Sequence, residues 1–155
     1  MGSYQQRVFR AGPDPRANSG SSRRSTAAGA LHDGRVQETL VIVDDHALFR
    51  SIAREKLEAD GINVLGEAGD GRSGLEVIAA LRPTIVLVDI HLPDIDGFAV
   101  ARRVADLVDP PVVVLTSSQP VGNLRRRSLG SAAAGFIAKE NLSGTALRIL
   151  LGRQP

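Results

Sequence analysis

The sequence predicts an α/β fold, in which a parallel sheet of five strands is doubly wound, with helices on both faces. Short apolar runs alternate along the chain with stretches whose apolar residues recur at helical spacing, a pattern typical of βαβ units. Most of these runs are continuously apolar, as expected for strands buried on both faces. Right-handed crossovers leave few ways to arrange such strands.

The strands and helices are predicted in turn from residue 39 onward. Apolar runs bounded by turn residues predict strands at 40–43, 62–68, 85–88, 112–115 and 136–138. Apolar residues at helical spacing predict four helices and the faces that they bury: Leu48, Phe49, Ile52, Ala53 and Leu57; Leu75, Ile78 and Ala79; Phe98, Ala101, Val104, Ala105 and Val108; and Leu142, Ala146, Leu147, Ile149, Leu150 and Leu151. A weaker helix is expected over roughly 121–129. Gly61, Pro83 and Gly152 are typical helix ends.

The domain is expected to span residues 38–152, between a tail of 1–37 and a short tail of 153–155. Residues 1–37 are predicted to be disordered, because they contain turn and linker sequences without apolar periodicity. Positive charge is also concentrated there: residues 1–38 hold six Arg against three acidic residues, whereas 39–155 hold thirteen basic and fourteen acidic residues. The nearly neutral domain is therefore not expected to bind DNA directly.

Composition excludes several other classes of protein. The chain contains no Cys, so disulfides and thiolate metal sites are excluded. Its longest apolar runs are far too short to span a bilayer, and no stretch near the N-terminus resembles a signal peptide. We therefore expect a soluble, cytoplasmic protein.

Polar side chains stand where the predicted strands end. Asp44 and Asp45 follow the first strand, Asp89 follows the third, Thr116 follows the fourth, and Lys139 ends the fifth. In open parallel sheets, ligands bind outside the carboxyl ends of the strands. These five residues are therefore the candidate site.

Three carboxylates at one sheet edge require a counter-charge. A pair 4 Å apart costs roughly 4 kcal/mol at an effective dielectric near 20. Mg²⁺ fits this need, because it prefers oxygen ligands and also contacts phosphate. A carboxylate nucleophile, a metal, a hydroxyl and an ammonium together are suited to phosphoryl transfer, with an acyl phosphate as the product.

Four segments resemble the signatures of response regulator receiver domains in two-component signalling. They are residues 43–46 (VDDH), 88–97 (VDIHLPDIDG), 115–117 (LTS) and 135–140 (GFIAKE). The resemblance covers residues 39–152 and implies a flavodoxin/CheY-like (βα)5 fold with strand order 2-1-3-4-5. The VDDH sequence and the Glu that follows Lys139 favour the NarL/FixJ class.

The resemblance also implies a role for each acidic residue. Asp89 would be the phosphoacceptor. Asp45 and Asp89 would bind Mg²⁺ directly, together with the backbone carbonyl of His91, and Asp44 would bind it through water.

Further roles follow from the same resemblance. Lys139 would pair with Asp89 or with its phosphoryl oxygens, and Thr116 would hydrogen-bond the phosphoryl group. Phe136 would be the aromatic switch residue that moves inward with Thr116. His91 and Ser118 would influence the lifetime of the phosphoryl group.

The sequence is therefore interpreted as a single-domain response regulator receiver in a phosphorelay. It would accept a phosphoryl group from a sensor histidine kinase or phosphotransfer protein and signal to a downstream protein through its fourth helix, last strand and last helix. It would not be a conventional enzyme, since it catalyses only its own phosphoryl transfer and slow dephosphorylation.

Three alternatives stay open at this point. The chain is also compatible with the receiver part of a truncated NarL/FixJ-type DNA-binding transcriptional regulator, or with an interaction module that works without phosphorylation. A phosphatase with an aspartate nucleophile is disfavoured, because such enzymes usually carry a second Asp where this chain has His91. A phosphorylation-dependent homodimer is a further alternative for the active state.

Overall fold

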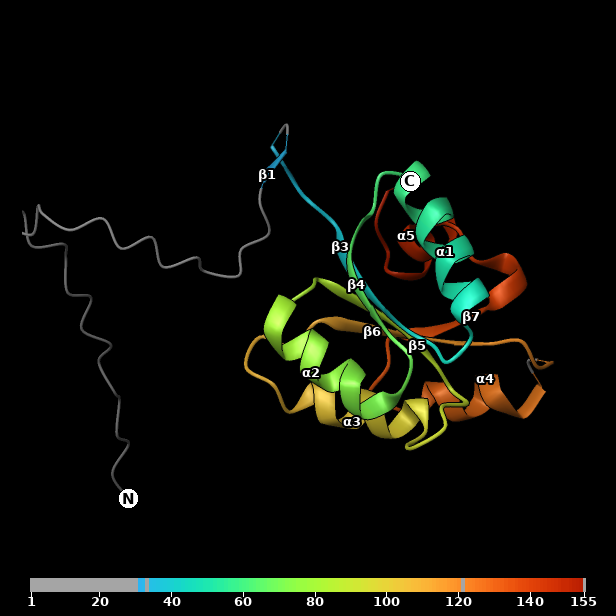
Figure 1. Ribbon diagram of the computed structural model, residues 1–155. Helices are drawn as coiled ribbons and strands as arrows, with labels where there is room; N and C mark the ends of the chain where they lie inside the picture. Colours follow the sequence, from blue (N-terminus) through green and yellow to red (C-terminus); the bar gives the residue numbers. More distant parts are fainter. Residues whose placement is uncertain (1–30, 33, 121, 155) are drawn as a thin grey trace, which may run out of the picture.

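The computed structural model describes residues 31–32, 34–120 and 122–154 and is built around a five-stranded sheet (Figure 1). All neighbouring strands of this sheet pair in parallel, in the order β4-β3-β5-β6-β7. Along the chain this is the order 2-1-3-4-5, which confirms the predicted fold class and topology. The strands are β3 (Thr39–Val43), β4 (Asn63–Ala68), β5 (Ile85–Asp89), β6 (Val112–Ser117) and β7 (Gly135–Ala138).

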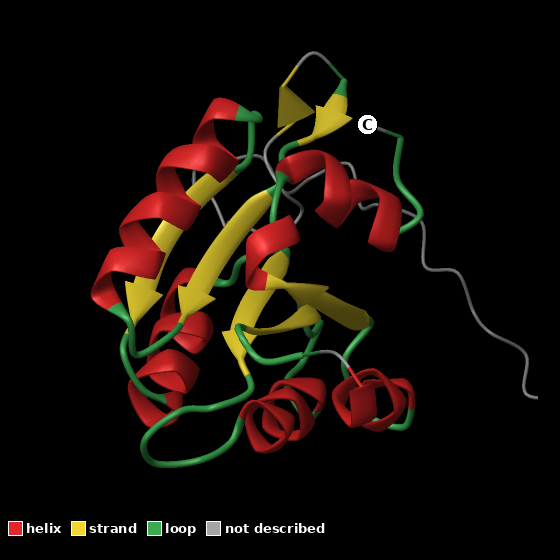
Figure 2. Ribbon diagram, turned by 90° about the vertical axis from the view of Figure 1, so that its right-hand side faces the viewer, coloured by secondary structure: helices red, strands yellow, loops and turns green. Residues whose placement is uncertain are grey.

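Helices cover both faces of the sheet, with α1 and α5 on one face and α2, α3 and α4 on the other (Figures 1 and 2). A short 3-10 helix, η1 (Lys139–Asn141), separates β7 from the last helix. None of the helices that the structure describes is both long and apolar enough to cross a membrane. The α-helices are α1 (Ala47–Ala59), α2 (Gly71–Leu81), α3 (Gly97–Ala105), α4 (Gly122–Leu129) and α5 (Gly144–Leu150).

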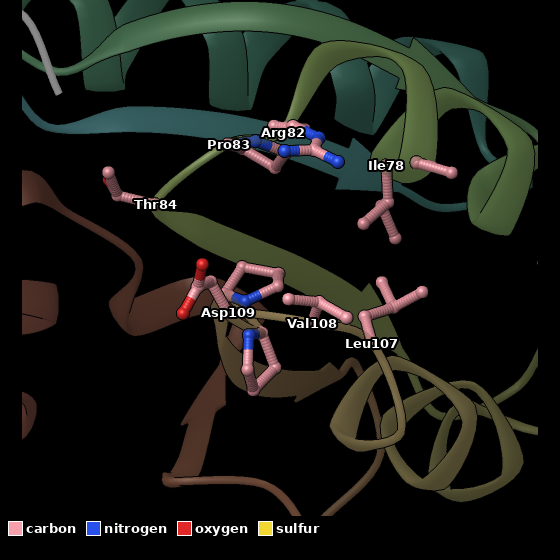
Figure 3. Close-up of a pocket in the computed structure, with 10 residues that line it drawn as sticks. Ile78, Arg82, Pro83, Thr84, Leu107, Val108 and Asp109 are labelled. Carbon is pink, nitrogen blue, oxygen red and sulfur yellow. The ribbon is translucent and has the colours of Figure 1, made fainter. Parts of the chain in front are cut away.

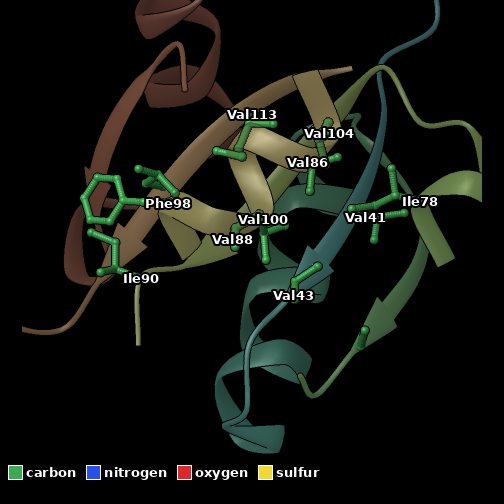
Figure 4. Close-up of a cluster of buried hydrophobic side chains, with 13 residues drawn as sticks. Val41, Val43, Ile78, Val86, Val88, Ile90, Phe98, Val100, Val104 and Val113 are labelled. Carbon is green, nitrogen blue, oxygen red and sulfur yellow. The ribbon is translucent and has the colours of Figure 1, made fainter. Parts of the chain in front are cut away.

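The core consists of two apolar clusters, one on each side of the sheet. Side chains alternate across a strand, so Val41 and Val43 of β3 face α2 and α3, whereas Leu40 and Ile42 face α1 and α5. Figure 4 shows the first of these clusters, where the valines of the sheet meet helix residues such as Ile78. Burial on both faces explains why the strands are continuous apolar runs in the sequence.

The predicted apolar face of α1 was only partly correct. Ala53 and Leu57 are buried, but Leu48 is 74% exposed and Ile52 is 54% exposed. The helix rests on the sheet along a narrow stripe, and these two residues lie outside the stripe. Apolar spacing thus identified the helix but overestimated the width of its buried face.

Four further residues of the predicted helix faces are exposed. Ala79, Ala105 and Ile149 were expected on the buried faces of α2, α3 and α5, but all three are exposed, Ile149 to 66%. Val108 was expected on the buried face of α3, yet that helix ends at Ala105 and Val108 is 86% exposed. The N–H of Leu107 donates back to the carbonyl of Val104 as the chain turns away from the helix.

A short hairpin precedes the domain. Strands β1 (Leu31–His32) and β2 (Arg35–Val36) pair in antiparallel fashion. Gly34 lies between them with a φ of 74°, a conformation that glycine adopts without a steric cost. The prediction of disorder for residues 1–37 did not anticipate this hairpin, and residues 1–30 lie outside the described part of the chain.

Candidate functional site

The candidate site lies where the carboxyl ends of four adjacent strands meet. Asp44 directly follows β3, and its strand neighbour Val43 pairs with Val88, which precedes Asp89 on β5. Asp89 in turn pairs with Thr116 on β6. Parallel pairing therefore places side chains from distant parts of the sequence side by side at one edge, as predicted.

The ammonium of Lys139 joins the two buried carboxylates. Its Nζ lies 2.6 Å from Oδ2 of Asp44 and 3.0 Å from Oδ2 of Asp89. The Lys139 side chain is 10% exposed, and its partners are 1% and 3% exposed. Burial alone would lower the pKa of Lys139, but the two carboxylates outweigh it and raise that pKa. Lys139 is therefore held in its charged form.

Asp89 is an acid whose charge the fold disfavours. Burial is the largest effect and raises its pKa, and the nearby charge of Asp44 acts in the same direction. A hydrogen bond from the backbone N–H of His91, at 3.1 Å, and the contact with Lys139 act against this rise without cancelling it. The site thus keeps more negative charge than one lysine compensates.

The backbone and a histidine also fix Asp44 and Asp45. The N–H of His46 donates to Oδ1 of Asp44 at 2.8 Å, and its ring Nδ1 lies 3.0 Å from Oδ1 of Asp45. A guanidinium nitrogen of Arg50 donates to the carbonyl of Asp44 at 2.7 Å. His46 was not among the predicted site residues, although its place beside the acidic pair was a signal for it.

Together these residues form a group that could hold a cation. One ligand atom from each of Asp44, Asp45, His46 and Asp89 lies within 4.8 Å of the others. Three of the four residues offer carboxylate oxygens, the ligands that Mg²⁺ and other hard cations prefer. The uncompensated negative charge described above fits the same kind of ion.

The hydroxyls at the end of β6 differ in their surroundings. Thr116 is fully buried, and its Oγ1 has no hydrogen-bond partner among the described residues. A buried hydroxyl without a partner is costly, so Thr116 is suited to an oxygen-rich ligand that arrives at the site. Ser117 is buried and accepts the N–H of Gln119 at 3.1 Å, whereas Ser118 is exposed.

The other predicted residues lie near this group. His91 is exposed, with its N–H on Asp89, and Phe136 is half-buried against the cluster beneath α2 and α3. The structure therefore gathers Asp44, Asp45, Asp89, Thr116 and Lys139 at one edge, with His91, Ser118 and Phe136 beside them. The roles of these residues in phosphorylation stay predictions.

Beside the site, the described residues form a pocket on the surface. This pocket, of about 320 Å³, lies between the ends of β6 and β7, where Ser117, Ser118 and Lys139 contribute to its wall. A larger pocket, of about 410 Å³, lies at the opposite edge of the sheet, between Arg82 and Pro83 on one side and Leu107 to Asp109 on the other (Figure 3). None of the predicted site residues lines this second pocket.

The fold and the group of acids, hydroxyl and lysine at its edge define a receiver-type domain. Residues 40–148 match the family model described as the response regulator receiver domain. The chain therefore belongs to the response regulator receiver family, as the sequence motifs had indicated.

Curated relatives and solved structures agree with this assignment. The chain is 38% identical over 104 residues to the "virulence factors putative positive transcription regulator BvgA" of Bordetella pertussis. The aligned segment covers 66% of this chain and 50% of that protein. It is also 38% identical over 103 residues to the "probable transcriptional regulatory protein NarL" of Mycobacterium tuberculosis H37Rv, and the aligned segment covers 66% of this chain and 48% of that protein. The chain thus spans about half the length of these relatives.

The similarity extends to the three-dimensional structure. The solved signal receiver domain of the putative response regulator NarL from Mycobacterium tuberculosis superposes with a TM-score of 0.67 at 34% identity, covering 76% of this chain and 98% of that one.

The sequence relatives also include a "protein-glutamate methylesterase/protein-glutamine glutaminase 3" from Hahella chejuensis, 38% identical over 84 residues and covered to only 24% of its length. The similarity therefore lies in the receiver domain, which occurs in longer proteins with different names.

Proposed function

We propose that this domain accepts a phosphoryl group on Asp89 from a sensor histidine kinase or a phosphotransfer protein, and that the modification changes its interaction surface. One observation carries the proposal. Asp89 is buried between two positively polarised groups, the Lys139 ammonium and the His91 N–H, beside a hydroxyl of Thr116 that has no partner among the described residues. An acid with a purely structural role would be paired within the fold, and the buried hydroxyl beside it would also have a hydrogen-bond partner.

The chain's own groups have distinct tasks in this reaction. A carboxylate oxygen of Asp89 attacks the phosphorus atom, and the bond from phosphorus to the donor breaks, which leaves an acyl phosphate. Lys139 stabilises the negative charge on the transferred group, since its ammonium already contacts Asp89 at 3.0 Å. The hydroxyl of Thr116 donates a hydrogen bond to a phosphoryl oxygen and so gains the partner that it lacks.

Asp44, Asp45 and Asp89 are the residues proposed to hold Mg²⁺, with the backbone carbonyl of His91 as a further ligand. The crowded carboxylates fit a divalent cation, because Asp89 retains a raised pKa even in contact with Lys139. When bound, the cation neutralises charge on the transferred phosphoryl group. Asp44 already contacts Lys139 at 2.6 Å, which is consistent with a ligand that reaches the ion through water.

The surface beside the site is suited to a protein donor. Leu48 and Ile52 project from α1 within two turns of Asp45, and they are 74% and 54% exposed. Exposed apolar side chains that rim a charged site are typical of a protein contact. We propose that the kinase or phosphotransfer protein docks on these two residues and presents its phosphohistidine to Asp89.

A response along β6 and β7, next to the site, is proposed through Thr116 and Phe136. Thr116 would move toward the phosphoryl group, and the half-buried ring of Phe136 would move into the space that this displacement leaves. The surface formed by α4, β7 and α5 would then change for a downstream partner. His91 and Ser118, which flank the site, would set how quickly water removes the phosphoryl group.

Phosphorylation by acetyl phosphate tests the proposal directly. The wild-type protein with Mg²⁺ should gain the mass of one phosphoryl group, and Asp89→Asn should gain none. Asp106→Asn is the matched control, because Asp106 is an exposed acid at the end of α3, outside the cluster. Normal labelling of Asp89→Asn, or no labelling of the wild type, would overturn the assignment.

A further inference from the structure

The aromatic ring of Phe49 forms a third contact of the site lysine. The Nζ of Lys139 lies 4.4 Å from the centre of this ring. Phe49 is half-buried in the first turn of α1, four residues after Asp45, and it packs against the core cluster beneath that helix. The ammonium therefore has two carboxylates and one aromatic face around it.

A lysine side chain needs such a restraint to hold a defined position. Its four-carbon stem is flexible and its ammonium has no preferred direction, unlike the planar group of arginine. Asp44 and Asp89 both attract the ammonium and are 2.6 Å and 3.0 Å from it, so ion pairing alone leaves the lysine free to shift toward Asp44. The electron-rich face of an aromatic ring attracts a cation without competing for its hydrogen bonds to carboxylates.

We propose that Phe49 is a positioning residue for phosphoryl transfer, which holds the Lys139 ammonium between Asp44 and Asp89 by a cation–π contact. The inference rests on the proposed function of Asp89. It assigns to Phe49 a task that neither the size nor the hydrophobicity of the ring would perform. A leucine or methionine would fill the space beside Lys139 but would not attract its charge.

The two lysines of the chain allow a direct test of the contact by NMR. Only Lys56 and Lys139 occur in the sequence, and Lys56 is exposed on the same helix as Phe49. In protein labelled with carbon-13 lysine, the Hε protons of Lys139 should be shifted upfield by the ring current of Phe49, relative to those of Lys56. The shift should persist in Phe49→Tyr and disappear in Phe49→Leu and Phe49→Met. An unshifted Lys139 in the wild type would overturn the inference.

The rate of phosphorylation by acetyl phosphate tests the functional consequence. Loss of a cation–π contact at a nearly buried ammonium should slow Phe49→Leu and Phe49→Met by roughly three- to tenfold. Phe49→Tyr should react at close to the wild-type rate, because it retains the ring. Two ring-free variants are used so that one unfolded variant does not decide the result.

The outcomes separate this inference from the proposed function. No phosphorylation of the wild type would remove the proposed function and with it the role of Phe49, whatever the NMR shift. Phosphorylation of the wild type, with ring-free variants that react equally fast, would overturn the role of Phe49 alone. Equal slowing of Phe49→Tyr and Phe49→Leu would also overturn it, because shape rather than the aromatic face would then be responsible.

Discussion

The carboxylate of Asp94 caps α2 at Gly71, a residue that lies 23 positions earlier in the chain. Its Oδ1 accepts the N–H of Gly71 at 2.8 Å, and its Oδ2 accepts the N–H of Arg72 at 2.9 Å. The two bonds satisfy N–H groups that the first turn of a helix leaves without partners. They tie the loop after β5, which contains the proposed ligand carbonyl of His91, to the start of α2.

The first prediction follows from this cap. Hydrogen bonds from the backbone, that of Gly71 foremost, lower the pKa of Asp94 to about 2. A lowered pKa stabilises the fold above the unfolded value near 3.8, and the contribution is lost as the pH falls toward 2. In urea unfolding, the wild type should therefore be more stable than Asp94→Asn at pH 6, and the difference should shrink between pH 4 and pH 2.5. A difference that grows on acidification would contradict the cap.

The second prediction concerns the charge of Asp89. The fold raises the pKa of Asp89, so the ionised carboxylate destabilises the folded state at neutral pH. This group stabilises the fold only at pH values below the pKa that it has in the folded state. Asp89→Asn should therefore melt higher than the wild type at pH 7 in EDTA, by about 2–4 °C for a change of about 1 kcal/mol. Mg²⁺ should stabilise the wild type more than the variant. Differential scanning calorimetry checks both effects, and a lower melting temperature for Asp89→Asn would oppose them.

The third prediction removes the counter-charge. Lys139→Met leaves the buried acids Asp44 and Asp89 side by side without their ammonium, which should cost about 3 kcal/mol in the free energy of unfolding. Lys56→Met is the control, because the exposed Lys56 should contribute little. Chemical denaturation at pH 7 in EDTA measures the difference. If the two variants lose equal stability, the ion pairs of Lys139 contribute nothing.

The fourth prediction tests a close approach of backbones at Gly97. A Cβ at this position would lie 2.5 Å from the carbonyl oxygen of Asp89 and 2.9 Å from the Cα of Ile90, and neither atom can move without shifting the end of β5. Gly97→Ala should cost about 2–3 kcal/mol and slow phosphorylation by acetyl phosphate. At Gly122 a Cβ would meet nothing within 4 Å, so Gly122→Ala should change neither quantity. Wild-type phosphorylation kinetics in Gly97→Ala would show that the loop can adjust.

Much of the fold and site could be predicted from the sequence, because those signals are local. Strands buried on both faces must be continuously apolar, and helices packed on them must repeat their apolar residues every three or four positions. Parallel strands end at one edge, so the sequence by itself predicts that Asp44, Asp89 and Lys139 meet. The chemistry of a carboxylate cluster then indicated a cation and a phosphoryl group.

The tertiary structure alone decided which neighbour each residue meets. Periodicity places Phe49 and Ile52 on an apolar stripe of α1, but only packing turns the first toward Lys139 and leaves the second 54% exposed. The cap of Asp94 on α2 joins segments 23 residues apart, and nothing in either segment specifies the other. The sequence by itself thus determined the elements and the chemical groups at their ends, since these depend on local patterns. Packing between distant segments decided the contacts that position those groups.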